Sequence, residues 1–140
     1  MPNRGTHVVA GAGIGTARAL MHERVWMKPD DRTGFVLGSA IGGGIGGALP
    51  DIIDTPCSPN HRQWAHALSS VGFFTATTWA AMNKLIEDIL KSAEAETRPF
   101  FRFLWFTLAG IIAGAGPGYL SHLALDACTP RGLPLFGIMS

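Results

Sequence analysis

Long apolar segments alternate with short polar connectors along the chain. The first segment runs from about Thr6, the expected N-cap, to Trp26, and the polar residues of Met27–Thr33 are expected to form a solvated turn. The second segment, Gly34–Leu49, carries no charged side chain and is expected to end at Pro50. Because the period-two alternation of strands is not found, the pattern predicts helices.

The second half of the chain continues in the same way after a proline-rich loop over Pro50–Asn60. A helix is predicted over Trp64–Ala95, and its second half is amphipathic, with charged residues opposite an apolar side. The last segment, Phe100–Ala127, includes 19 residues without a charged side chain, Phe103–Ser121, close to the roughly 20 that cross a bilayer. Pro117 is expected to kink this segment or to divide it into two helices.

Small residues recur at every fourth position in three of the segments, and residues four apart share one face of a helix. The three sets are Gly11, Gly15 and Ala19; Gly34, Gly38, Gly42 and Gly46; and Gly110, Gly114 and Gly118. Each glycine weakens a helix in water by about 1 kcal/mol, but glycine lets another helix backbone approach closely, as it does in membranes. We therefore predict an all-α fold: one domain over residues 1–140, a compact, membrane-associated bundle of four to six helices with glycine-rich, close-packed seams.

Composition favours a membrane setting and excludes two classes of function. Charged residues make up 15% of the chain, below the roughly 25% of a typical soluble domain. The net charge is +1 and the basic residues are scattered, so no direct nucleic-acid binding is expected. The glycines after His7 resemble a dinucleotide-binding fingerprint, but Thr16 replaces its third glycine and no βαβ unit surrounds it. A soluble helical bundle is the alternative to a membrane protein.

The ionisable residues that occur in apolar surroundings are mostly histidine and aspartate. They are His7, Asp51, Asp54, His61, His66, His122 and Asp126. Burying such groups is costly, and a metal cation held by neutral imidazole and ionised carboxylate removes that cost. His122 and Asp126 are four residues apart on a predicted helix, so they share one face. Each residue alone is weak evidence, because a single histidine in apolar surroundings is more often a structural, hydrogen-bonded residue, and an aspartate can be a helix cap or part of a buried ion pair. Seven such residues together favour a metal site.

The chemistry of these ligands favours a divalent metal, zinc first, with manganese or iron as alternatives, because nitrogen and oxygen are offered without thiolate. More than four ligands would also allow two metals roughly 3.5–4 Å apart, the arrangement that attacks phosphoesters with a metal-activated water. Asp54 is then the candidate catalytic base. Arg62 is the candidate to hold an anionic oxygen, with Arg131 as the alternative.

Three blocks of sequence carry a family resemblance: LPDIIDTP (Leu49–Pro56), HRQWAHALS (His61–Ser69) and GYLSHLALDACTPRGLPLFG (Gly118–Gly137). They resemble the YdjM-type family, described as inner-membrane-associated, LexA-binding, metal-dependent hydrolases that are distantly similar to the all-helical zinc-dependent phospholipase C and P1 nuclease group. The resemblance implies metal ligation by His7, Asp51, His61, His66, His122 and Asp126, with Asp54 as a further candidate. Many relatives read PDIDH, whereas here Ile53 and Asp54 follow Ile52, so one histidine of the pattern is missing.

These observations lead to one expected function and one alternative. The expected protein is a metal-dependent hydrolase, integral to the inner (cytoplasmic) membrane or tightly associated with it, that acts on phosphoesters, including those of lipids. The alternative is a non-catalytic helical membrane protein whose metal site is structural or absent. Membrane lipid is the expected partner in either case, together with a second copy of the chain or another membrane helix.

Overall fold

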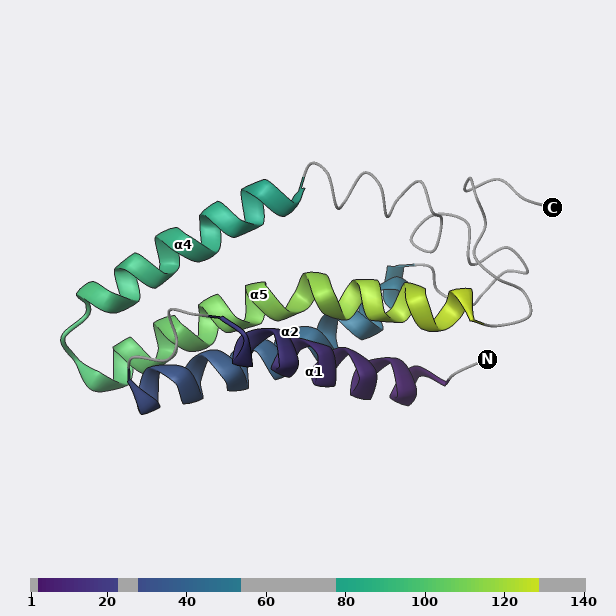
Figure 1. Ribbon diagram of the computed structural model, residues 1–140, viewed down its shortest axis with the longest axis horizontal. Coiled ribbons are helices and arrows are strands. Elements are labelled where there is room, and N and C mark those ends of the chain that lie inside the picture. Colours follow the sequence, from purple (N-terminus) through teal and green to yellow (C-terminus); the bar gives the residue numbers. More distant parts are fainter. Residues whose placement is uncertain (1–2, 23–27, 54–77, 129–140) are drawn as a thin grey trace.

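The structure, a computed structural model, describes residues 3–22, 28–53 and 78–128. Within these ranges the chain forms helices and no strands. The helices are α1 (Arg4–Leu20), α2 (Pro29–Ile53), α4 (Trp79–Ala95) and α5 (Pro99–Ala127). Figure 1 shows α1, α2 and α5 lying lengthwise against one another, with α4 on the other side of α5. The all-α prediction is confirmed.

The close contacts between helices fix their relative directions. A Cβ atom added to Gly38 would overlap the backbone of Thr107, and one added to Gly46 would overlap that of Ala115, so α2 and α5 run parallel. The order is reversed against α1, because Gly47 near the end of α2 approaches the first turns of α1. The start of α1 therefore lies at the same end of the molecule as the ends of α2 and α5 (Figure 1).

All three predicted small-residue faces form the seams between these helices. At Gly43 the three helices meet: a Cβ on this residue would overlap the carbonyl oxygen of Gly11 in α1, and a Cβ on Gly118 in α5 would overlap the carbonyl oxygen of Gly43 itself. Only hydrogen in place of a side chain allows backbones to approach this closely. The seams among α1, α2 and α5 are thus built on backbone contacts, whereas α4 packs on the bundle through large apolar side chains.

The helix ends differ from the sequence-based expectation at four places. Helix α1 ends at Leu20 instead of continuing to about Trp26. Asn3, not Thr6, is the N-cap of α1, and its side-chain oxygen accepts a hydrogen bond from the Thr6 backbone N–H at 2.9 Å. Helix α2 begins at Pro29, so most of the expected solvated turn is helical. This start agrees with the preference of proline for the first helical turn, where its missing N–H is not needed. The same helix continues through Pro50 to Ile53.

The long last segment is also more regular than expected, because α5 is a single continuous helix that contains Pro117. Gly114 and Gly118, which lie before and after this proline, pack against the backbone of α2. Such packing is able to stabilise an interruption of the backbone hydrogen bonds. The amphipathic character expected for Trp64–Ala95 is confirmed over α4, which buries Ile86, Ile89 and Leu90. The earlier part of that segment, residues 64–77, lies outside the described residues.

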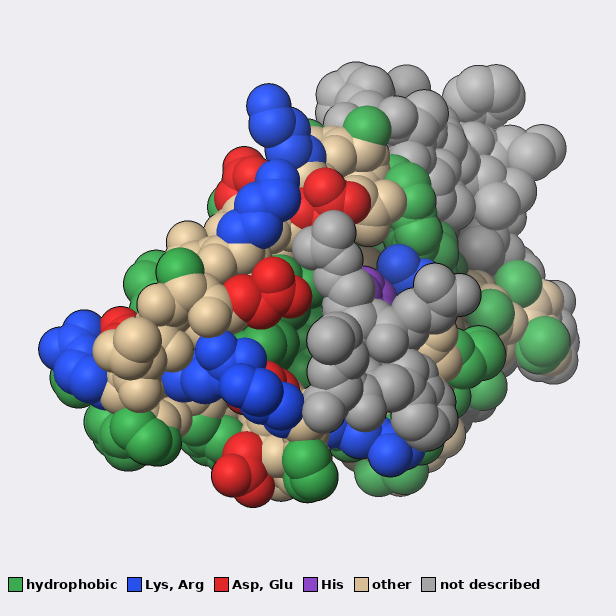
Figure 2. Space-filling view, turned by 60° about the vertical axis from the view of Figure 1, so that its left-hand side comes forward, with side chains coloured by type: hydrophobic (Ala, Val, Ile, Leu, Met, Phe, Trp, Pro, Cys, Tyr) green, Lys and Arg blue, Asp and Glu red, His purple; other side chains and the backbone are tan. Residues whose placement is uncertain are grey.

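A partly buried ion pair joins three helices at the end of the molecule where α2 and α5 begin. Arg102 binds Asp31 through two hydrogen bonds, of 2.8 Å from Nε and 2.6 Å from Nη2. Its remaining Nη1 group donates to the carbonyl oxygens of Ala93 and Glu94 in the last turn of α4. One guanidinium therefore ties α5 to α2 and caps α4. Figure 2 shows that further charged side chains gather on the surface of this end.

Two of the described helices, α2 and α5, are long and apolar enough to cross a membrane. Several of their large apolar side chains are exposed, including Leu37, Ile41 and Ile45 along one line of α2. In water such a line would be unfavourable, whereas in lipid it needs no cover.

Candidate metal centre

Four of the predicted ligands come together where α1 begins and where α2 and α5 end. His7 lies in the first turns of α1, Asp51 in the last turn of α2, and His122 and Asp126 in the last turns of α5. The directions of the three helices explain why residues so far apart in sequence meet here. The antiparallel α1 brings its start to the point where the parallel pair ends (Figure 1).

The distances within this cluster are short and similar to one another. Asp126 lies between the two histidines, with Oδ1 at 3.5 Å from Nε2 of His7 and Oδ2 at 3.5 Å from Nε2 of His122. Oδ1 of Asp51 lies 3.7 Å from the same nitrogen of His122. The two imidazole rings are stacked, with centroids 3.7 Å apart and an angle of 20° between their planes.

The hydrogen bond of His122 determines which of its nitrogens can bind a cation. Nδ1 lies 2.6 Å from the carbonyl oxygen of Gly47, and because a carbonyl only accepts, Nδ1 carries the hydrogen and donates it. In the neutral ring Nε2 then has a lone pair, which is directed at the carboxylates of Asp51 and Asp126. Lone pair and carboxylate repel each other unless a positive species lies between them. A backbone carbonyl that orients the second nitrogen in this way is typical of metal-binding histidines.

Burial makes the need for a positive species stronger. His7 and Asp126 are each 2% exposed, and His122 is 0% exposed. A carboxylate removed from water must be compensated by a cation or by several hydrogen-bond donors. The side chain of Asp51 is 29% exposed. Among the described residues of the cluster, it is Asp51 that reaches the surface, so this is the side from which a ligand would approach.

The geometry fits a metal ion. Ligand atoms that lie about 2.0–2.2 Å from a tetrahedral zinc are about 3.3–3.6 Å from one another, and the nitrogen–oxygen distances of the cluster are 3.5, 3.5 and 3.7 Å. They exceed the 2.7–3.2 Å that is typical of a hydrogen bond. One ligand atom from each of His7, His122 and Asp126 lies within 4.8 Å of the others. These residues could therefore hold a metal ion.

Gly47 positions both histidines although it offers no side chain. Its carbonyl oxygen accepts the hydrogen bond from His122, and a Cβ on this residue would overlap the carbonyl oxygen of His7. Gly46, which precedes Gly47, is four residues before Pro50. Because proline has no backbone N–H, the carbonyl of Gly46 does not receive the usual helical hydrogen bond. Sequence reasoning did not assign a role to Gly47. Its place four residues before Asp51, on the same face of α2, was the available signal.

The remaining predicted site residues lie outside the described residues. They are the ligands His61 and His66, the candidate catalytic residues Asp54 and Arg62, and the alternative Arg131. Their roles stay predictions. His22, the one histidine not assigned to the site, lies apart from the cluster against Phe35, with ring centroids 5.1 Å apart.

The fold and the cluster together define a class: a helical membrane protein with a buried histidine and aspartate group that could hold a metal ion. The chain belongs to the YdjM inner membrane protein family, whose sequence model matches residues 1–137. This membership confirms the family resemblance of the three sequence blocks and the expected localisation in the inner membrane. No curated protein and no solved structure matches the chain.

Proposed function

We propose that this protein is a metal-dependent hydrolase of the inner membrane that acts on phosphoesters. The observation that carries the proposal is the arrangement around His122, whose Nε2 faces two carboxylates while Nδ1 is fixed by a backbone carbonyl. A polar cluster this deeply buried is costly, and in a membrane protein it is a functional candidate by default.

His7, His122 and Asp126 would hold the metal from the buried side. Asp51 would complete the set from the exposed side, where the approach of substrate and water is easiest. A divalent metal bound here would supply Lewis acidity towards a phosphoryl oxygen and would lower the pKa of a water molecule. Zinc suits two imidazoles and carboxylate best, and manganese or iron would also accept these ligands.

The chain offers further groups for the reaction among the residues beyond Ile53. Asp54 is the candidate to accept a proton from the attacking water, and Arg62 is the candidate to hold the anionic oxygen of the phosphoester. His61 and His66 are candidate ligands of the same metal or of a second one. Lipid phosphoesters are the favoured substrates because the site belongs to a membrane protein.

Metal content tests the first half of the proposal. The full chain, purified in mild detergent without chelators, should contain close to one or two equivalents of zinc, manganese or iron by elemental analysis. Asp126→Asn keeps the size of the side chain and removes the charge, so it should lose most of that metal. Asp88→Asn is the matched control, because Asp88 is exposed on α4. A wild-type protein that is folded and free of metal would contradict the proposal.

Hydrolysis tests the second half. The metal-loaded wild type should hydrolyse a generic phosphodiester such as bis-p-nitrophenyl phosphate, and Asp126→Asn should not, while both are extracted from membranes equally well. If the wild type binds metal tightly but is inactive towards phosphodiesters, monoesters and phospholipids, the metal is structural. The protein would then be a non-catalytic bundle whose exposed apolar helices pack with a second copy or another membrane helix.

A further inference from the structure

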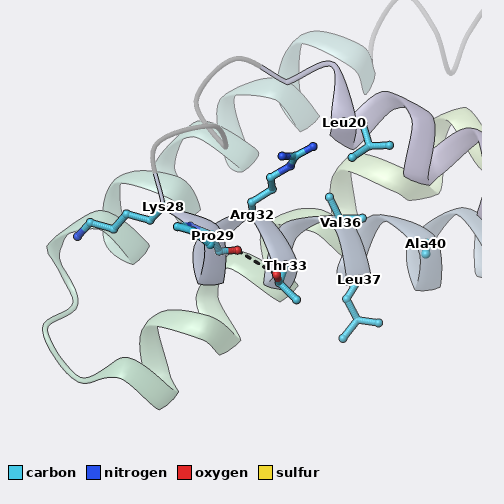
Figure 3. A pocket seen from close by; sticks show the side chains of 8 residues that line it. All are labelled: Leu20, Lys28, Pro29, Arg32, Thr33, Val36, Leu37 and Ala40. Atoms are coloured by element: carbon cyan, nitrogen blue, oxygen red, sulfur yellow. Dashed lines mark hydrogen bonds between the residues drawn. The ribbon is translucent and has the colours of Figure 1, made fainter.

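Two grooves in the described part of the bundle differ in their lining and in their distance from the histidine and aspartate cluster. The larger groove, of about 610 Å³, lies between the end of α1 and the first turns of α2, and two of its lining residues, Lys28 and Arg32, are basic. Figure 3 shows these two side chains at the start of α2, with Val36 and Ala40 in the turns that follow. Even Ala40 is eleven residues from Asp51 of the cluster, which at about 1.5 Å per residue corresponds to about 16 Å.

The smaller groove, of about 130 Å³, lies where the first turn of α4 meets α2 and α5. Its wall on α2 is Leu49, which is two residues, about 3 Å along the helix axis, from Asp51. On α5 the lining residues begin at Leu120, two residues before His122, and reach back to Ala115, about 10 Å from His122 along the axis. In its position along the helices, the smaller groove therefore starts beside the cluster and runs towards the middle of the bundle.

The lining of the smaller groove contains no charged side chain among the described residues. The charged residues of α4 begin at Lys84, two residues after Met82, the last lining residue on this helix. Two hydroxyl groups and one indole are the polar side-chain groups of the lining, from Thr78, Tyr119 and Trp79. Such a lining offers van der Waals contacts to an apolar chain and offers no ion pair to an anion.

Gly116 keeps the floor of this groove open. A Cβ atom at this position would meet nothing within 4 Å, whereas at Gly114 and Gly118 it would overlap the backbone of α2. Close packing of helices thus explains glycine at positions 114 and 118 but not at position 116, where glycine weakens the helix relative to alanine. Together with Ala115, Gly116 leaves a floor without large side chains.

A lipid phosphoester has a shape that matches the cluster and the groove together. Its phosphate lies at the surface of the hydrocarbon layer, and its alkyl chains run inward, along the membrane helices. Helix α2 carries no charged side chain between Arg32 and Asp51, so the cluster lies where the apolar part of this helix ends and Leu49 lies within that part. With the phosphate at the cluster, one alkyl chain of the same molecule would lie in the groove.

We propose that the groove at Gly116 binds one alkyl chain of the substrate and selects long-chain lipid phosphoesters over water-soluble ones. The proposal rests on the proposed function for the reaction at the cluster. The groove contributes positioning: a chain that it holds limits the motion of the ester beside the cluster, and binding of such a remote part of a substrate raises kcat/KM.

A matched pair of substrates tests the selection. p-Nitrophenyl methyl phosphate and p-nitrophenyl dodecyl phosphate release the same p-nitrophenolate on hydrolysis and differ only in the alkyl chain. The measured quantity is the ratio of kcat/KM for the dodecyl ester to that for the methyl ester, in one mild detergent. Gly116→Leu fills the floor and should lower this ratio at least about tenfold, because misfits of a single methylene in an apolar pocket already have effects of this size. Gly116→Ala should lower it less.

Two control variants separate the groove from other effects of added side chains. Gly13→Leu is the matched control, since a Cβ atom at Gly13 also meets nothing within 4 Å and this residue lies on the exposed side of α1. Ala40→Leu partly fills the larger groove. Both should keep the ratio of the wild type at equal helical content by circular dichroism. An unchanged ratio in both Gly116 variants, or a fall in Ala40→Leu instead, would overturn the groove proposal while hydrolysis of both esters would still support the proposed function.

Photo-cross-linking provides a readout that does not depend on turnover. Dodecyl phosphate with a diazirine at the end of its chain should label peptides that contain Met82 or residues 115–120 of the full chain in detergent. The label should be lost in Gly116→Leu and retained in Gly13→Leu. If the wild type hydrolyses neither ester but is labelled in this way, the proposed function fails and the groove remains an alkyl-chain site. Labelling that is equal in both variants, or a change in the oligomeric mass of Gly116→Leu with an unchanged ratio, would overturn the proposal, the latter by assigning the groove to a second copy of the chain.

Discussion

Replacement of Gly114 by alanine tests the close approach of α2 and α5 most directly. A Cβ at this position would overlap the carbonyl oxygen of Ser39 and would lie 2.8 Å from its carbonyl carbon and 2.9 Å from the nitrogen of Gly43. Backbone atoms cannot rotate away as the end of a flexible side chain can. The helices would have to separate by roughly 1 Å or more to restore ordinary contacts, and a gap of about 0.5–1 Å already forfeits about a quarter to a half of the dispersion energy of each pair of atoms.

The expected cost follows from these distances. Overpacking of a core usually destabilises a protein by about 1–3 kcal/mol, and the seam makes the upper part of that range the expectation for Gly114→Ala. The gain in helix propensity from glycine to alanine is at most about 1 kcal/mol in the opposite direction. The net free energy of unfolding should therefore fall by about 1–2 kcal/mol.

A matched control lies two residues further along the same helix. A Cβ on Gly116 meets nothing within 4 Å, so Gly116→Ala should leave the free energy of unfolding unchanged or raise it by up to about 1 kcal/mol. Both variants can be measured by equilibrium unfolding in mixed detergent micelles, followed by circular dichroism at 222 nm. If the two variants unfold within about 0.5 kcal/mol of each other, the reasoning about the seam is refuted.

Three further predictions concern charged groups. Arg102→Met should lower the free energy of unfolding by about 3–5 kcal/mol because it leaves the buried carboxylate of Asp31 without its partner. Addition of Asp31→Asn to this variant should recover part of the lost free energy in unfolding experiments. The hydrogen bonds from Arg98 hold the pKa of the Glu96 carboxyl at about 2, below its usual 4.5, so any stabilisation by this pair is present above pH 4.5 and is lost as the pH falls through 2. A carbon NMR titration should show the midpoint of Glu96 returning towards 4.5 in Arg98→Gln, and an unchanged midpoint would contradict the assignment. A chelator should lower the melting temperature of the wild type, since a ligand at 100 times its dissociation constant stabilises by about 2.7 kcal/mol, but it should have no effect on Asp126→Asn.

The seams could be predicted from sequence because they depend on a local property. Glycines at every fourth position must share a helix face, and a face without side chains has few uses other than close packing. The direction of the helices could not be predicted in this way. The parallel arrangement of α2 and α5 depends on how the long connection between them folds, and spacing within either helix is the same for both directions.

The histidine and aspartate residues were recognised because ionisable groups are rare in apolar segments. His122 and Asp126 could even be paired, since four residues separate them on one helix. The meeting of His7 with this pair could not be derived, because it depends on the packing of α1 against α2. The helix ends were the least accurate part: proline was taken as a stop at Pro50, whereas in the structure Pro50 lies in the last turn of α2, where tertiary packing tolerates the missing hydrogen bond.

Gly47 makes the geometry of the candidate metal centre dependent on a residue that has no side-chain ligand atom. The absence of a Cβ atom on its Cα allows the close approach of the backbone that carries His7, and its carbonyl oxygen sets the orientation of the His122 ring. Any side chain at this position would shift one histidine relative to the other while leaving every ligand present. The affinity of this cluster for a metal ion, and its preference for one metal over another, would therefore be adjustable by small changes in helix spacing.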